Sequence, residues 1–127
     1  MTIPFKTLTA AKNAAQSGDT IIVLPGTYNE NNLAKNGVNW HFLTGANLEY
    51  SGTGSALFDT TGSAASFKVT GSGVFKTTNV SGGVRAFSLA NNADVATVQF
   101  DRIEARGQAI YSAGTLTATG NEAKSTA

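Results

Sequence analysis

The densest group of side chains that could do chemistry lies at Asp101, Arg102, Glu104 and Arg106. Two carboxylates with basic neighbours are suited to general acid–base catalysis, in which one group gives a proton and another takes one. Glu49 would join them if it stacked on the same face of a sheet as Glu104. The competing interpretation, which we favour, is a solvated corner whose charges compensate one another. The candidate catalytic residues are therefore Asp101, Glu104 and Arg102.

A second set of candidates consists of side chains that could bind a ligand. His41 is the only histidine, and its place between Trp40 and Phe42 favours an outward position on a strand over a catalytic role. Tyrosines can stack on sugar rings and arginines can pair with acidic sugars, although both more often serve packing. The candidate ligand-binding residues are His41, Lys68, Tyr111 and Arg106.

Several kinds of site are excluded by what the sequence lacks. Cysteine is absent, which rules out disulfides and thiolate metal ligands. The sequence has no Asp-x-Asp or Asp-Asp pair of the kind that favours calcium. It also has no phosphate-binding loop or nucleotide fingerprint. We therefore expect no metal and no cofactor.

The bulk composition predicts one domain made of short strands and tight turns. The chain has 127 residues, of which 13% are charged, against about 25% in an average soluble domain. A net charge of +1 argues against nucleic acid as a partner. No run approaches the roughly 18 apolar residues of a membrane span, so we expect no membrane insertion. The N-terminus lacks the pattern of a signal peptide.

The first elements that must position these side chains are a helix and a strand. The spacing of Leu8, Ala11 and Ala14 or Ala15 predicts a short amphipathic helix within residues 5–17. Thr7 is its expected N-cap, with Phe5 packing against it and Gly18 following it. Its thin apolar face suggests a lid over other elements. The β-branched run at 20–24 predicts a strand that stops at the Pro-Gly pair 25–26.

Beyond residue 37 the apolar clusters are short and separated by turn residues, which predicts strands and no helix. They fall into three sets, with steps of 18 to 35 residues, that could each form one face of a coil: Ile22, Leu57, Phe87 and Ile110; His41, Lys68, Gln99 and Thr117; Glu49, Phe75 and Glu104. Such repetition is typical of solenoids. We expect about 3–4 coils of three short, parallel strands each, with residues 1–19 as a cap and 20–127 as the coils.

The expected coils define which side chains point inward. The predicted core includes Trp40, Phe42, Phe67, Val69, Val98 and Phe100. The set that contains His41 would then form one outward column. The alternative fold is a small antiparallel β-sandwich with an N-terminal helix, and the lack of strong two-residue hairpin turns argues against it.

Residues 10–30, AAKNAAQSGDTIIVLPGTYNE, resemble the N-terminal cap and first coil of right-handed parallel β-helices of the pectin-lyase-like superfamily. The matching residues are Ala14, Ala15, Gly18, Asp19, Thr20, Ile21, Val23, Pro25, Gly26, Thr27, Tyr28 and Glu30. The close match covers about a sixth of the chain. The resemblance implies an all-β, right-handed parallel β-helix with a capping helix. The resemblance says little about function, because proteins similar to this superfamily include lyases, hydrolases, phage tailspikes and adhesins.

The functional expectation rests on that resemblance and on the end of the sequence. No second capping helix follows Leu116, so we expect either a truncated domain or another chain that covers this end. Phage fibres and tailspikes are similar, because their short β-helical domains assemble side by side. We therefore expect a structural or receptor-binding module of a phage or phage-like particle, located in the virion. We expect it to form a homo-oligomer, with a trimer favoured, or to assemble with other virion proteins and bind surface polysaccharide.

Two alternatives remain open. One is the N-terminal part of a secreted carbohydrate-active enzyme, a lyase or a glycoside hydrolase. The other is a bacterial surface adhesin module. Both alternatives place the protein outside the cell or on its surface.

Overall fold

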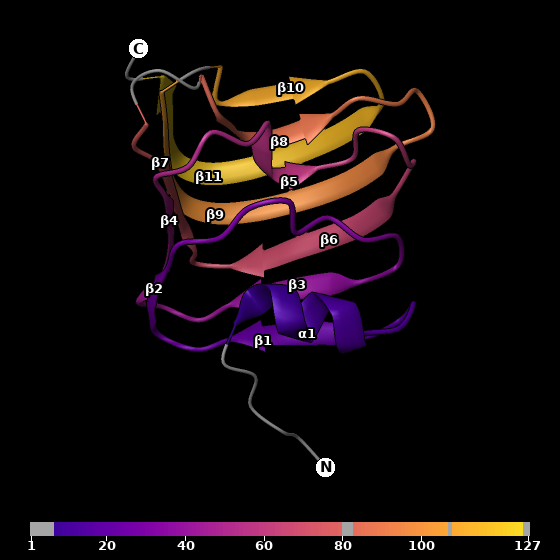
Figure 1. Ribbon diagram of the computed structural model, residues 1–127, viewed down its shortest axis with the longest axis horizontal. Coiled ribbons are helices and arrows are strands. Elements are labelled where there is room, and N and C mark those ends of the chain that lie inside the picture. Colours follow the sequence, from indigo (N-terminus) through magenta and orange to yellow (C-terminus); the bar gives the residue numbers. More distant parts are fainter. Residues whose placement is uncertain (1–6, 80–82, 107, 126–127) are drawn as a thin grey trace.

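The computed structural model describes residues 7–79, 83–106 and 108–125. One helix and eleven strands lie in this part of the chain (Figure 1). They are α1 (Leu8–Ala14), β1 (Thr20–Val23), β2 (Gly26–Tyr28), β3 (Asn39–Phe42), β4 (Ala46–Tyr50), β5 (Ala56–Asp59), β6 (Ser66–Gly71), β7 (Val74–Thr77), β8 (Arg85–Leu89), β9 (Val95–Ala105), β10 (Ile110–Ser112) and β11 (Thr115–Ser125).

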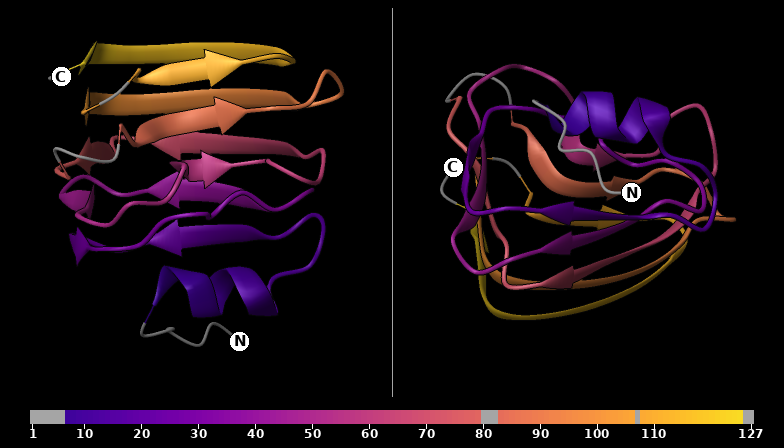
Figure 2. Two further views of the ribbon diagram at one scale, coloured as in Figure 1. Left: turned by 45° about the horizontal axis from the view of Figure 1, so that its top comes forward. Right: turned by 90° about the horizontal axis from the view of Figure 1, so that it is seen from below.

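The strands form two sheets, and the pairs within both are parallel. The larger sheet has the order β1-β3-β6-β9-β7-β4-β2, with β11 paired to β9, and the smaller one has the order β10-β8-β5. The first part of β9 pairs with β6 and its second part pairs with β7. The larger sheet therefore curls at β9 into a half-barrel, and the smaller sheet lies across from it (Figures 1 and 2).

The predicted right-handed parallel β-helix is wrong. Its three short strands per coil would require three separate columns of strands, whereas the strands are hydrogen-bonded into two sheets. The difference arises at β9 and β11, which each run for 11 residues. Gln99 and Glu104, which were expected on separate faces of the coil, therefore lie on one continuous strand. Backbone hydrogen bonding continues around this bend, so the two expected columns become one curled sheet. The antiparallel sandwich is also excluded for the described strands, because their pairs are parallel.

Helix α1 covers the end of the molecule opposite to β10 and β11 (Figure 2). Thr7 is its N-cap, as predicted, and its side chain accepts a hydrogen bond from Ala10 N at 3.0 Å. Leu8, Ala11 and Ala15 are buried, while Ala14 is exposed. The helix is shorter than the predicted span 5–17, and Phe5 lies outside the described residues.

The core between the two sheets is strongly aromatic. Phe58 lies at its centre: its ring stacks on Phe67 and Phe87, with interplanar angles of 14° in both pairs. It also meets Trp40 and Phe42 edge-on. The six predicted core residues are all buried: Trp40, Phe42, Phe67, Val69, Val98 and Phe100. Strand alternation was therefore read correctly.

The predicted outward column of His41, Lys68, Gln99 and Thr117 is wrong in register. His41 lies opposite Thr70, whereas Lys68 and Thr117 both lie opposite Thr97. Gln99 lies opposite Thr119. The four side chains share one face but belong to two rows, two residues apart along the strands. The predicted set of Ile22, Leu57, Phe87 and Ile110 is also wrong. Ile22 pairs with His41 in the larger sheet. In the smaller sheet Phe87 lies opposite Ile110, as predicted, but its partner on β5 is Phe58 and not Leu57.

Candidate functional site

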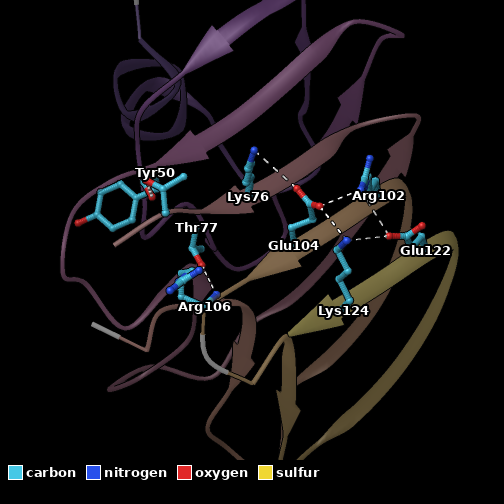
Figure 3. Close-up of polar contacts among 9 residues, drawn as sticks. Tyr50, Lys76, Thr77, Arg102, Glu104, Arg106, Glu122 and Lys124 are labelled. Carbon is cyan, nitrogen blue, oxygen red and sulfur yellow. Dashed lines mark hydrogen bonds and ion pairs between the residues drawn. The ribbon is translucent and has the colours of Figure 1, made fainter. Parts of the chain in front are cut away.

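Two outer surfaces of the half-barrel carry most of the candidate residues, and the first is a ladder of charges. It lies on β7, the second half of β9, and β11 (Figure 3). Glu104 is its centre: Arg102 Nη2 lies 2.8 Å from its carboxylate, Lys124 Nζ lies 3.3 Å away, and Lys76 Nζ lies 3.7 Å away. Glu122 completes the ladder, with Oε1 3.6 Å from both Arg102 Nη2 and Lys124 Nζ. We call these five residues the charge ladder.

The environment of Glu104 keeps it ionised. A hydrogen bond from Lys124 lowers the pKa of the Glu104 carboxyl below its usual value, and the positive charges of Arg102, Lys124 and Lys76 lower it further. A general acid at neutral pH requires the opposite shift, so that the carboxyl keeps its proton. The oxygens of the Glu104 carboxylate are also occupied by ion pairs with three cations. The ladder is therefore built like an ion-pair network.

Asp101 and Glu104 are separated by the bend in β9. Asp101 accepts a hydrogen bond from Asn121 Nδ2 at 2.6 Å, whereas the Glu104 carboxylate lies among the cations of the ladder. The alternation of buried and exposed residues breaks at Asp101 and Arg102, which are both outside the core. Among the catalytic candidates, the fold therefore brings Arg102 and Glu104 together, whereas Asp101 lies at the bend of β9.

Glu49 lies on the same face as Glu104, as expected. Glu49 is opposite Lys76, and Lys76 is opposite Glu104. The two carboxylates are therefore two strands apart, with a lysine between them. Lys76 Nζ pairs with the Glu104 carboxylate at 3.7 Å, so a cation occupies the space between the two carboxylates. Lys76 and Lys124 were missed in the sequence because the register that aligns them with Glu104 was unknown.

The second surface is the outer face of β1, β3, β6, the first half of β9, and β11, which we call the polar wall. His41 Nδ1 lies 2.8 Å from Thr70 Oγ1 on the next strand. The side-chain oxygen of Asn39 accepts a hydrogen bond from Lys68 N at 3.0 Å. The side-chain oxygen of Gln99 accepts one from Gly71 N at 3.1 Å. These bonds between neighbouring strands hold polar side chains in two straight rows.

Shallow hollows lie at both ends of the polar wall. One of about 310 Å³ is lined by Asn39, Lys68 and Thr97, among other residues. Another of about 310 Å³ is lined by Gln99, Asp101 and Asn121, among others, at the bend of β9. The wall between these hollows offers hydrogen-bonding groups at the 4.7–4.9 Å spacing typical of neighbouring strands. Such a surface suits a long polar ligand better than a small enclosed one.

The two remaining ligand candidates lie away from the polar wall. Tyr111 is on β10 of the smaller sheet, where the Arg85 guanidinium lies 5.0 Å from its ring centroid. Arg106 follows β9, and its backbone N donates to Thr77 Oγ1 at 2.8 Å (Figure 3). His41 and Lys68 are therefore brought to one surface, whereas Tyr111 and Arg106 are not.

Asp94 is a buried charged residue that the sequence analysis passed over. Its carboxylate accepts hydrogen bonds from Thr60 Oγ1 at 2.6 Å, Ala65 N at 2.8 Å and Asn91 N at 2.9 Å. Burial alone would raise the pKa of Asp94, but the hydrogen bond from Thr60 and those from Ala65 and Asn91 hold it below its usual value. Each donor lies in a turn or next to one. The Asp94 carboxylate therefore holds these turns together and does not form a reactive site.

No group of three or more His, Cys, Asp or Glu side chains in the described part of the chain is arranged to hold a metal ion. The one described helix is too short to cross a membrane.

Comparisons with known proteins gave no relative for the chain. No family model matches the sequence. The curated proteins and the solved structures gave no match either. The likeness of residues 10–30 to pectin-lyase-like proteins therefore stays a resemblance of one short segment.

Proposed function

We propose that this chain is a structural, receptor-binding module of a phage or phage-like particle, such as a tail fibre, a tailspike or a capsid decoration. In this role it binds a surface polysaccharide and assembles with copies of itself or with other virion proteins. The observation that carries the proposal is the polar wall, with its two rows of hydrogen-bonding side chains on parallel strands.

A repeating polymer is the ligand class that such a wall fits. His41, Thr70 and Gln99 are tied across strands by hydrogen bonds, so they are ordered before a ligand arrives. Preordered groups lose less conformational freedom on binding. Lys68 adds one positive charge to the wall, which favours an acidic sugar. The charge ladder supports a non-enzymatic role, because its central carboxylate is ionised and surrounded by cations.

The test is retention of purified bacterial capsular polysaccharides and lipopolysaccharides on the immobilised protein. We expect retention of at least one polymer without release of new reducing ends or unsaturated sugars. Lys68→Ala and His41→Ala should each weaken retention, whereas Lys76→Ala, on the charge ladder, should leave it unchanged. Lys76→Ala is the matched control because it also removes one exposed lysine from a strand.

Two results would contradict this function. Cleavage of a polymer that is lost in Glu104→Gln or Asp101→Asn would make the protein a carbohydrate-active enzyme. Failure to retain any of the polymers would remove the receptor-binding role. The trimer expected from the resemblance stays a prediction that light scattering can check.

A further inference from the structure

Strand β11 has one edge without a partner among the described residues, because it pairs only with β9. Its side chains are exposed along almost the whole strand. An unpaired edge of this length is a template for another strand, unless charges or bends protect it. The second half of β11 carries such charges, Glu122 and Lys124, and their pattern specifies what can pair with it.

The charges of the ladder, together with Glu49, alternate from strand to strand. One row runs Glu49, Lys76, Glu104 and Lys124, and its signs alternate at every step. The neighbouring row places Arg102 opposite Glu122. Opposite charges on facing strands stabilise a sheet, and like charges destabilise it. A strand added to β11 must therefore place a positive charge opposite Glu122 and a negative charge opposite Lys124.

Few segments of this chain satisfy that rule. A parallel strand needs a basic residue followed two positions later by an acidic one, and the sequence has this only at Arg102 and Glu104. An antiparallel strand needs an acidic residue followed two positions later by a basic one. The sequence has this at Glu104 and Arg106 and at Glu122 and Lys124. Because β9 is already paired on both edges, only β11 itself remains.

We propose that two copies of this chain join through the second halves of their β11 strands, paired antiparallel about a twofold axis at Ala123. This axis places Glu122 opposite Lys124 of the second copy, and Lys124 opposite Glu122 of the second copy. Twofold interfaces of this kind are self-complementary. Both charges then continue the alternation of their rows across the interface.

The inner side of β11 also suits a second copy. Leu116, Ala118 and Ala123 lie opposite the core residues Ala96, Val98 and Ile103 of β9. They continue the inward-facing rows at the end of the molecule that α1 does not cover (Figure 2). A second copy placed on this end buries these side chains together with the open edge. The inference stands apart from the proposed role in a particle, because it depends only on β11 and its neighbours.

The test exchanges charges between the two facing positions. In a dimer of Glu122→Lys, a lysine at position 122 faces Lys124 of the second copy at both places. In a dimer of Lys124→Glu, a glutamate at position 124 faces Glu122 of the second copy at both places. We expect the unchanged chain to be a dimer by sedimentation equilibrium, rather than the trimer that the resemblance favours. Each variant alone should dimerise at least about tenfold more weakly. An equimolar mixture should recover the dimer, because each variant then supplies the charge that the other needs.

A cross-link gives a second readout that does not depend on charge. The chain has no cysteine, so Ala123→Cys should form a disulfide-linked dimer on mild oxidation. Ala14→Cys, exposed on the helix at the other end, should stay monomeric under the same conditions. A monomer at every soluble concentration would overturn the proposal. So would a dimer that the charge changes leave intact, or a mixture that fails to recover it.

Discussion

Phe58 contributes more ring contacts to the core than its place in a four-residue strand suggests. Its ring meets those of Trp40, Phe42, Phe67, Phe75 and Phe87 at centroid distances of 5.0 to 6.4 Å. These partners come from both sheets. The ring therefore joins the half-barrel to the smaller sheet, in addition to filling volume.

We predict that Phe58→Ala lowers the free energy of unfolding by about 3–5 kcal/mol, because it leaves a cavity in a packed core. Urea unfolding followed by tryptophan fluorescence would measure this loss through Trp40. Val95→Ala removes an exposed apolar side chain and should change stability by less than about 0.5 kcal/mol. Similar losses in the two variants would contradict the central position of Phe58.

Asp94 is a buried carboxylate whose ionisation contributes to folding. Its pKa is held below the usual value in the folded protein. A carboxyl with a lowered folded pKa stabilises the protein fully above its unfolded pKa, about 3.9. This contribution is lost as the pH falls through the folded pKa, because the proton then binds in both states.

Asp94→Asn tests this contribution. We expect it to cost about 2–3 kcal/mol at pH 7, because an amide NH₂ would replace a carboxylate oxygen that accepts hydrogen bonds. Stability of the variant should also fall less steeply than that of the unchanged chain as the pH is lowered from 6 to 3. Urea midpoints across this range would measure both effects. Parallel pH curves would show that another carboxylate is responsible.

At the scale of elements, helix α1 is fastened at both ends by one loop. Leu8 N and Thr9 N both donate to the Glu30 carboxylate at 2.8 Å. At the other end, Lys35 Nζ donates to Lys12 O at 2.9 Å and to Ala15 O at 2.6 Å. An anion at the N-terminus and a cation at the C-terminus both oppose the charges of the helix dipole. A seven-residue helix with little apolar surface depends on such partners.

We predict that Glu30→Ala lowers the free energy of unfolding by about 1–2 kcal/mol through the lost cap. Thermal unfolding by circular dichroism would measure the change. Asn13→Ala, exposed on the same helix, is the matched control and should be neutral or slightly stabilising, because Ala favours helix. An equal loss in both variants would show that the carboxylate does not hold the helix.

At the scale of the whole molecule, charge alternation runs around the second half of the larger sheet. The ion pairs of Glu104 and Glu122 lie at the surface, where Glu104 is partly buried and its partners are exposed, so each pair contributes little by itself. Their larger effect is on which strand can be added to β11, since a mismatch places like charges directly opposite each other. In the proposed dimer, the ladder therefore affects assembly more than folding.

We predict that salt weakens the proposed dimer while leaving the fold intact. Raising the ionic strength from about 0.05 M to about 0.5 M shortens the Debye length to a few ångströms, which screens the four facing charges. The dissociation constant from sedimentation should rise several-fold. The far-ultraviolet circular dichroism should stay constant in the same solutions. A dimer that tightens in salt would point to an interface held by apolar contacts alone.

The sequence by itself determined which side chains face the core. Alternation along 39–42, 66–70 and 95–100 is enough for this, because a strand repeats every two residues. It also indicated the helix, its cap at Thr7, and the common face of Glu49 and Glu104. Each of these features is local, or depends only on which side of a strand a residue occupies.

The tertiary structure alone decided register, sheet closure and the grouping of the candidates. A shift of two residues keeps every side chain on its own face, so apolar pattern could not separate Lys68 opposite Thr97 from Lys68 opposite Gln99. The bend at Asp101 and Arg102 looks like a strand end in sequence, yet hydrogen bonding continues through it. The charge ladder depends on both, because Lys76 and Lys124 surround Glu104 only in the register that the folded sheet adopts.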